Sequence, residues 1–170
     1  MRNPKTRLLI LRSVIAVLLL GHLCLIFHYS NEPATQSDQT STSFIETLLQ
    51  AVHPSFRTLP EETRQARVQS LQKAVRSLAH LAEFAMLGVL VCALLLTFSV
   101  QIRWLAAGLG FCAVCAAADE IHQLFVAGRT FQWEDIAVDT VGAAAGLAGC
   151  FLLCRLFRRV WKRRKKGASA

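Results

Sequence analysis

Residues 78–100 read LAHLAEFAMLGVLVCALLLTFSV, an apolar run whose two ionisable side chains, His80 and Glu83, lie near its start. As a helix, this run is long enough to cross about 30 Å of hydrocarbon. Three further runs of similar length lie at residues 8–27, 104–126 and 136–157. None of the runs shows the period-two alternation of a membrane β-strand. The sequence therefore predicts an all-α integral membrane bundle of four transmembrane helices.

The composition points to the same class. Of the 170 residues, 54% are hydrophobic, 18% are charged and 8% are aromatic, which is too apolar for a soluble domain of this length. The first run follows Arg2, Lys5 and Arg7, as the core of a signal peptide would. It is longer than a typical signal core, and no small-x-small cleavage site follows it. We expect a retained first helix, with a cleaved leader as the alternative.

Basic residues predict the orientation, because those that flank membrane helices stay in the cytoplasm. The segment from Arg155 to Lys166 has eight basic residues and no acid, whereas residues 29–77 balance five basic against five acidic side chains. We therefore expect a single multi-pass domain over residues 1–170 of a cell-membrane protein. Both termini and the basic tail, residues 158–170, would be cytoplasmic, and residues 29–77 would form an extracytoplasmic segment. The tail lacks a folded module for nucleic acid, so anionic membrane lipids are its expected partners.

The extracytoplasmic segment is predicted to be only partly helical. Residues 30–41 read SNEPATQSDQTS, which is too polar to bury and favours a loop. Residues 44–52 favour a short helix. Residues 58–61 read TLPE and match a capping box, so a helix is expected to start there and to run into the span at 78–100. Tight turns are predicted at residues 101–103 and 127–130.

Cysteines carry no chemistry in this interpretation. All six lie in the predicted spans: Cys24, Cys92, Cys112, Cys115, Cys150 and Cys154. The Cys112-x-x-Cys115 spacing resembles a zinc or redox pair, but it lies midway along an apolar helix without a second pair. We therefore interpret these residues as small packing side chains.

The placement of the acidic residues is the main functional signal. Six of the eleven acids lie in the last three runs or in the turn between the last two: Glu83, Asp119, Glu120, Glu134, Asp135 and Asp139. A charge in hydrocarbon costs at least about 2.5–3.5 kcal/mol, so such side chains normally face the bundle interior or water and mark function. The available basic partners are Arg76, His80, His122 and Arg129.

Helical spacing brings these side chains onto three inward faces. The first face carries Arg76, His80 and Glu83. The second carries Asp119, His122 and Gln123, with Glu120 at its border. The third carries Asp135 and Asp139, followed by a glycine seam at Gly142, Gly146 and Gly149. At about 1.5 Å per residue, His80, Asp119 and Asp139 fall at a common depth, in a pocket open to the cell exterior.

Two kinds of chemistry suit this set of side chains. Carboxylates beside histidines can divide acid and base roles when their surroundings separate their pKa values. A divalent metal is the other option, with ligands among His80, Glu83, Asp119, His122 and Asp139, although no spacing is a recognised metal signature. Simpler explanations exist for single residues: Asp135 stabilises a helix N-terminus, and Arg129 snorkels to the interface.

Two blocks of sequence resemble the VanZ-like family. They are VRSLAHLAEFAMLG, residues 75–88, and DEIHQLFVAGR, residues 119–129, the second continuing through Asp135 and Asp139 to Gly142. Ala127 stands where many members have proline, and Glu32 where glutamine is common. The resemblance implies a four-helix membrane protein, and for the founding members an association with resistance to glycopeptide antibiotics, teicoplanin in particular. It supplies no reaction. The positions that match the family's are His80, Glu83, Asp119, Glu120, His122, Gln123, Arg129, Asp135 and Asp139.

Three functions remain open at this point. The first is an enzyme that acts by acid–base, optionally metal-assisted, chemistry on a lipid-linked cell-wall precursor. Its catalytic residues would be His80, Glu83, Asp119, Glu120, His122 and Asp139, and its substrate-binding residues Gln123, Arg129, Asp135 and Arg76. The second is a non-catalytic protein that binds an envelope lipid or shields a drug target. The third is a small proton-coupled transporter, which would need an oligomer to enclose a path.

Overall fold

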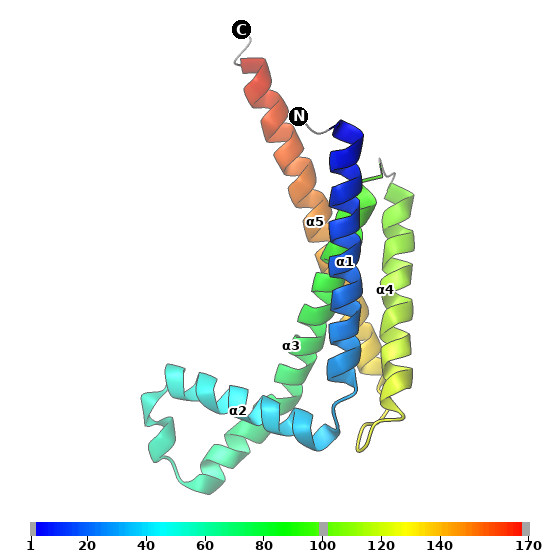
Figure 1. The fold of residues 1–170 in the computed structure, drawn as a ribbon. Coiled ribbons are helices and arrows are strands. Elements are labelled where there is room, and N and C mark those ends of the chain that lie inside the picture. Colours follow the sequence, from blue (N-terminus) through cyan, green and yellow to red (C-terminus); the bar gives the residue numbers. More distant parts are fainter. Residues whose placement is uncertain (1–2, 99–101, 168–170) are drawn as a thin grey trace.

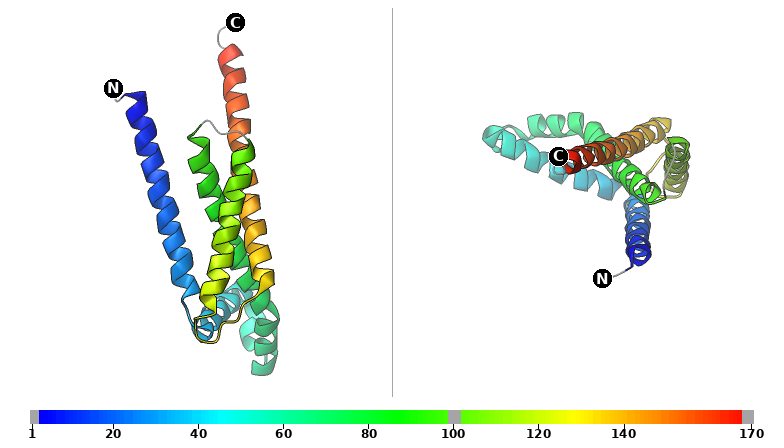
Figure 2. Two further views of the ribbon diagram at one scale, coloured as in Figure 1. Left: turned by 90° about the vertical axis from the view of Figure 1, so that its right-hand side faces the viewer. Right: turned by 90° about the horizontal axis from the view of Figure 1, so that it is seen from above.

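The protein is all-helical, as predicted, over the part of the chain that the computed structural model describes, residues 3–98 and 102–167 (Figure 1). The helices are α1 (Pro4–Ser30), α2 (Ala34–Val52), the short 3₁₀ helix η1 (Pro54–Thr58), α3 (Glu61–Leu96), α4 (Ile102–Gln123) and α5 (Trp133–Gly167). Four of them, α1, α3, α4 and α5, are long and apolar enough to cross a membrane. The N- and C-termini lie at the same end of this bundle (Figures 1 and 2), as an even number of crossings requires.

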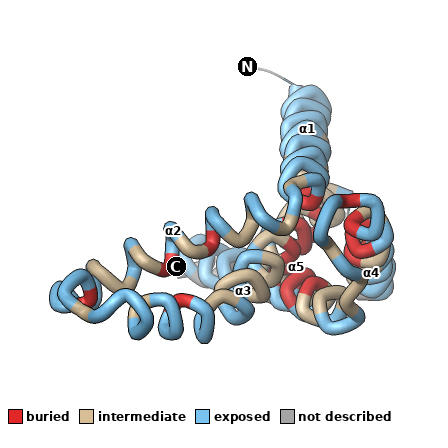
Figure 3. The backbone as a smooth tube through the Cα atoms, turned by 90° about the horizontal axis from the view of Figure 1, so that it is seen from below, coloured by how far each residue is buried: buried red, intermediate tan, exposed pale blue. Residues whose placement is uncertain are grey.

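Helix α3 is much longer than a membrane crossing needs. Its 36 residues span about 54 Å at 1.5 Å per residue, against about 30 Å of hydrocarbon. The first half of α3 leaves the bundle and packs against α2 and η1, so that residues 34–77 form a lateral arm (Figures 1 and 3). The core of the arm consists of Ile45, Phe56 and Val68, all at most 5% exposed.

The prediction of a loop over residues 30–41 was wrong, because α2 already begins at Ala34. Its polar side chains suit a helix, since their hydroxyls bond within it: Thr40 donates to the carbonyl of Gln36, and Ser41 to that of Ser37. The predicted short helix over residues 44–52 is the second half of α2.

The start of α3 was predicted correctly, but its cap was not. Pro60 occupies the N-cap position, and the Thr58 hydroxyl donates instead to the carbonyl of Ser55, 2.8 Å away within η1. The helix then continues unbroken into the span, as expected. The turn predicted at 101–103 is also displaced, since α4 begins at Ile102, while residue 101 lies outside the described residues. The turn at 127–130 is present, with Gly128 at φ +75°.

Helices α3 and α5 form the most extensive contact in the bundle. A Cβ atom at Gly142 would overlap the backbone carbonyl of Leu81, and one at Gly146 would overlap that of Ala85. These glycines therefore let the two backbones touch, as the predicted seam requires. The seam ends there, because a Cβ at Gly149 would meet nothing within 4 Å.

Helix α1 lies at the edge of the bundle, and most of its surface is exposed (Figure 3). Two polar contacts attach it to α3. The Nε2 atom of His22 is 2.8 Å from the backbone carbonyl of Glu83, and Arg12 donates to both the carbonyl and the hydroxyl of Thr97, the residue that caps α3. The six cysteines are all free thiols, of which Cys92 and Cys112 are buried in the core as predicted, whereas Cys24 is exposed.

Candidate functional site

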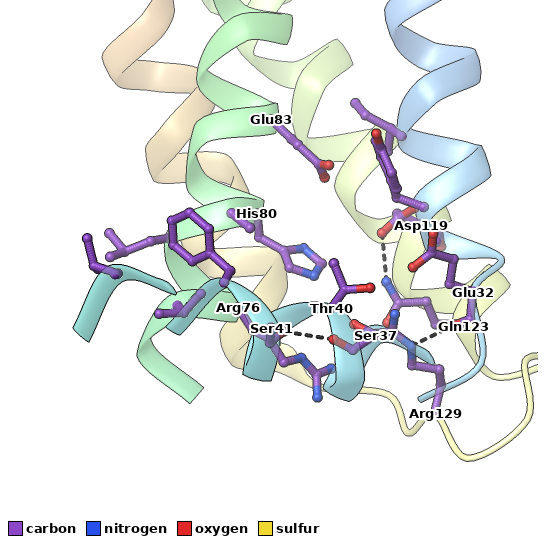
Figure 4. A pocket seen from close by; sticks show the side chains of 18 residues that line it. Glu32, Ser37, Thr40, Ser41, Arg76, His80, Glu83, Asp119, Gln123 and Arg129 are labelled. Atoms are coloured by element: carbon purple, nitrogen blue, oxygen red, sulfur yellow. Dashed lines mark hydrogen bonds between the residues drawn. The ribbon is translucent and has the colours of Figure 1, made fainter. Parts of the chain in front are cut away.

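A pocket of about 700 Å³ opens at the end of the bundle opposite the two termini (Figures 1 and 4). Residues from α1, α2, α3, α4 and the loop after α4 line it. Its polar wall consists of Glu32, Arg76, His80, Glu83, Asp119, Gln123 and Arg129. Its apolar wall consists of Ile26, Tyr29, Phe44, Leu48, Val75 and Leu78. The lining of the pocket therefore combines charged and apolar side chains.

Three predicted site residues from three different helices meet at the polar wall. These residues are His80 on α3, Asp119 on α4 and Asp139 on α5. Each offers one ligand atom, and the three atoms lie within 4.8 Å of one another. The Nδ1 atom of His80 is 3.4 Å from Oδ1 of Asp139. Asp119 is 8% exposed and Asp139 is completely buried. The common depth that helical spacing predicted for these three residues is thus confirmed.

The glycine seam explains why Asp139 is buried. Asp139 lies one turn before Gly142, on the face of α5 that packs against α3. Neither of its carboxylate oxygens accepts a hydrogen bond from the residues that the structure describes. The Nδ1 atom of His80 also lacks a hydrogen-bond partner there. Buried polar atoms of this kind are costly to leave unsatisfied.

Asp119 is held by its own helix. The side-chain amide of Gln123, one turn later on α4, donates to Oδ2 of Asp119 over 2.9 Å, and both side chains are buried (Figure 4). The side chain of Glu83 faces the same cavity from α3 (Figure 4). His80, Glu83 and Asp119 thus present an imidazole and two carboxylates to one space, and side chains of these types can act as general acids and bases.

Two of the predicted catalytic residues lie elsewhere. The ring of His122 packs against that of Phe27 on α1, with 4.6 Å between centroids, and does not line the pocket. Glu120 is completely buried and accepts a hydrogen bond of 2.8 Å from the backbone amide of Gln132. Its position fits a role in fastening the loop after α4.

Arg129, a predicted substrate-binding residue, lines the pocket. Its Nε donates to the backbone carbonyl of Glu32, 3.2 Å away (Figure 4). Burial lowers the pKa of Arg129, and the positive charge of Arg76 acts in the same direction. Two guanidinium groups near one opening repel each other, and an anionic group bound between them would relieve this repulsion.

Arg76 and Asp135 share a second, smaller hollow. Arg76 forms an ion pair with Asp38 of α2, with 3.6 Å between Nη1 and Oδ1. Asp135 lies in the first turn of α5 and lines this hollow of about 320 Å³ together with Arg76 and Asp38. Arg76 lines both cavities and therefore links them.

Helix α2 also contributes to the pocket, which was not predicted. Ser37, Ser41, Phe44 and Leu48 line the pocket at spacings of four, three and four residues. This is the same one-face pattern that revealed the stripe on α3. The polar composition of residues 30–41 concealed the pattern, because it favoured a loop.

Comparison with known proteins identifies one family. The family model described as VanZ/LLP1 matches residues 15–158, a range that contains the whole of the polar wall. No curated protein and no solved structure matches the chain.

Proposed function

The chain belongs to the VanZ/LLP1 family, and from that premise we propose that it acts on a lipid-linked cell-envelope substrate at the extracytoplasmic membrane surface, by acid–base chemistry. The substrate's charged headgroup would contact the polar wall, and its hydrocarbon chain the apolar wall. The observation that carries this proposal is that the lining of one pocket combines charged and apolar side chains.

The basic tail supports the orientation. Its described part, residues 158–167, forms the last turns of α5, at the end of the bundle opposite the pocket (Figure 1). Because basic flanks stay in the cytoplasm, this end would be cytoplasmic and the pocket would face outward. The headgroups of envelope precursors are presented on that side of the membrane, within reach of such a pocket.

The apolar wall supports a lipid rather than a water-soluble ligand. Phe44 and Leu48 on α2 and Leu78 on α3 are 58%, 48% and 62% exposed, although they lie beside a cavity. Exposed apolar side chains at this level can contact acyl chains of the bilayer or of a bound lipid. Helix α2 runs across the axis of the bundle (Figure 1), the arrangement expected of a helix at the membrane interface.

The polar wall supports the roles of single residues. Arg76 and Arg129 would bind the phosphate or carboxylate of the headgroup, because guanidinium groups form paired hydrogen bonds with such anions. His80, Glu83 and Asp119 would transfer protons to and from the reacting group. His122 and Glu120, which lie outside the pocket, would act through the position of α4 and of the loop after it.

The test uses single variants of the polar wall in a bacterial host that lacks a family member. Asp119→Asn and His80→Gln keep the size of each side chain and remove its charge or proton-transfer capacity. The matched controls are Glu134→Gln and His53→Gln, which change exposed residues away from the pocket. Envelope lipids and wall precursors are measured by mass spectrometry, and susceptibility to teicoplanin is measured in parallel.

We expect the unchanged protein and both controls to alter the precursor profile relative to an empty vector, and Asp119→Asn and His80→Gln not to. Full activity of both variants at equal protein levels would refute the proposal. If a precursor co-purifies with the protein without any change in its mass, the pocket binds without turnover, as in the alternative function. The glycopeptide resistance that the family resemblance implies would then arise from shielding of the drug's target.

A further inference from the structure

We propose that His80, Asp119 and Asp139 bind a divalent transition-metal cation, of which Zn²⁺ and Mn²⁺ suit the ligands best. This inference concerns only the ligand geometry of these three residues and does not rest on the lipid-linked substrate proposed above.

The three side chains converge on one place in the bundle. They come from α3, α4 and α5, and one ligand atom of each lies within 4.8 Å of the others. A tetrahedral ion with ligands at about 2.1 Å holds neighbouring ligands about 3.4 Å apart. The Nδ1 atom of His80 and Oδ1 of Asp139 already have this separation, 3.4 Å.

The buried carboxylate of Asp139 lacks a hydrogen-bond partner among the described residues. Its side chain is 0% exposed, and neither carboxylate oxygen accepts a hydrogen bond from the described residues. The separation of 3.4 Å from His80 exceeds the roughly 2.7–2.9 Å of a charge-assisted hydrogen bond. A carboxylate without a donor in such a place is strongly disfavoured. A cation bound to its oxygens would remove this cost.

The types of ligand and the pocket beside them also suit a metal ion. One imidazole nitrogen and two carboxylate oxygens suit borderline and hard divalent ions, whereas soft ions prefer thiolates. Three protein ligands leave a coordination position free, as in catalytic zinc sites. His80 and Asp119 also line the pocket, so that position would face the cavity and could take a water molecule or a substrate oxygen.

Neighbouring groups hold two of the ligands in position. Gln123 donates to Oδ2 of Asp119. Hydrogen bonds of this kind orient metal-binding carboxylates in known sites. The contact between Gly142 and the carbonyl of Leu81 fixes the helix that carries Asp139 against the helix that carries His80.

The competing explanation is a metal-free ion pair between protonated His80 and ionised Asp139. The experiment uses the full chain in lipid nanodiscs, stripped with EDTA and then loaded with Zn²⁺ or with Mn²⁺. Bound metal is counted by elemental mass spectrometry after removal of the excess. Mn²⁺ binding is titrated by electron paramagnetic resonance, and melting is followed by tryptophan fluorescence.

We expect about one ion per chain, a higher melting temperature with metal than without it, and binding at least about tenfold weaker in Asp139→Asn and in His80→Gln. The controls Glu134→Gln and His53→Gln should bind like the unchanged protein.

An unchanged protein that holds no more metal than Asp139→Asn, or that melts alike with and without metal, overturns the proposal. If Asp139→Asn does not fold, Asp119→Asn takes its place. Metal binding without an effect on envelope lipids would refute the proposed function alone. An effect on envelope lipids without metal binding would refute the metal site alone.

Discussion

Gln123 holds Asp119 by a hydrogen bond of 2.9 Å between two buried side chains, one turn apart on α4. Asp119 therefore has a fixed direction before any ligand arrives, and Gln123 is a positioning residue. We expect Gln123→Leu to weaken Mn²⁺ binding about tenfold, as loss of such an orienting partner does in other sites. Titration by electron paramagnetic resonance measures the change.

The matched control for Gln123 is Gln39→Leu, which changes an exposed glutamine of α2 outside the pocket lining. A purely structural role for Gln123 would lower the melting temperature of the metal-free protein and leave the metal affinity of the folded fraction unchanged. That result would contradict the positioning role.

The glycine seam between α3 and α5 predicts a sharp difference between two glycines of one helix. Gly146→Ala should destabilise the protein by about 1–3 kcal/mol, because its Cβ would overlap the carbonyl of Ala85 and force the helices apart. Gly149→Ala should be neutral or stabilising, since its Cβ meets nothing within 4 Å and alanine favours a helix. Unfolding in mixed detergent measures both, and equal effects would refute the role of the seam.

The bundle and the meeting of His80, Asp119 and Asp139 could be predicted because they depend on local periodicity. Apolar runs of membrane length leave only helices, and the spacing of charged side chains along each helix fixes which of them share a face. Depth then follows from counting residues from the turns. These three steps need no knowledge of which helices touch.

The rest of the site depends on tertiary contacts that the spacing does not specify. The backbone amide of Ala34 donates to the carbonyl of Ala127, which joins the start of α2 to the loop after α4 and brings α2 over the pocket. His122 shares a helix with Asp119, but it contacts Phe27, because α1 packs beside α4 there. A one-dimensional pattern cannot tell which neighbour such a side chain meets.

The apolar wall predicts a dependence of lipid contact on Phe44. Replacing Phe44 by serine should reduce labelling of the protein by a phospholipid that carries a photoreactive group on its acyl chain, by about tenfold if about 1.5 kcal/mol of apolar burial is lost. Val52→Ser is the control, because Val52 is exposed on the same helix but does not line the pocket. Equal loss in both variants would mean that α2 contacts bulk lipid only.

Arg129 predicts a preference for anionic headgroups. Arg129→Gln should weaken retention of an anionic phospholipid about tenfold, because a hydrogen bond to a charged group contributes about 1.5–3 kcal/mol. Binding of a zwitterionic phospholipid of the same chain length should change little. Native mass spectrometry of the protein with each lipid measures the ratio. Arg67→Gln on the exposed surface of α3 is the control, and a similar effect there would show that only net charge matters.

The orientation of the bundle gives a prediction on which the proposed function depends. Both termini lie at one end and the pocket at the other (Figures 1 and 4), so the two ends must face opposite compartments. Basic residues favour the cytoplasm for the termini. A fluorescent protein that folds only in the cytoplasm should therefore fluoresce when fused after residue 170. Alkaline phosphatase, which is active only outside, should be active when inserted at His53, between α2 and η1.

The reverse pattern would place the pocket on the cytoplasmic side and would refute an extracytoplasmic substrate. It would leave the metal site standing, because the ligand geometry of His80, Asp119 and Asp139 does not depend on which compartment the pocket faces.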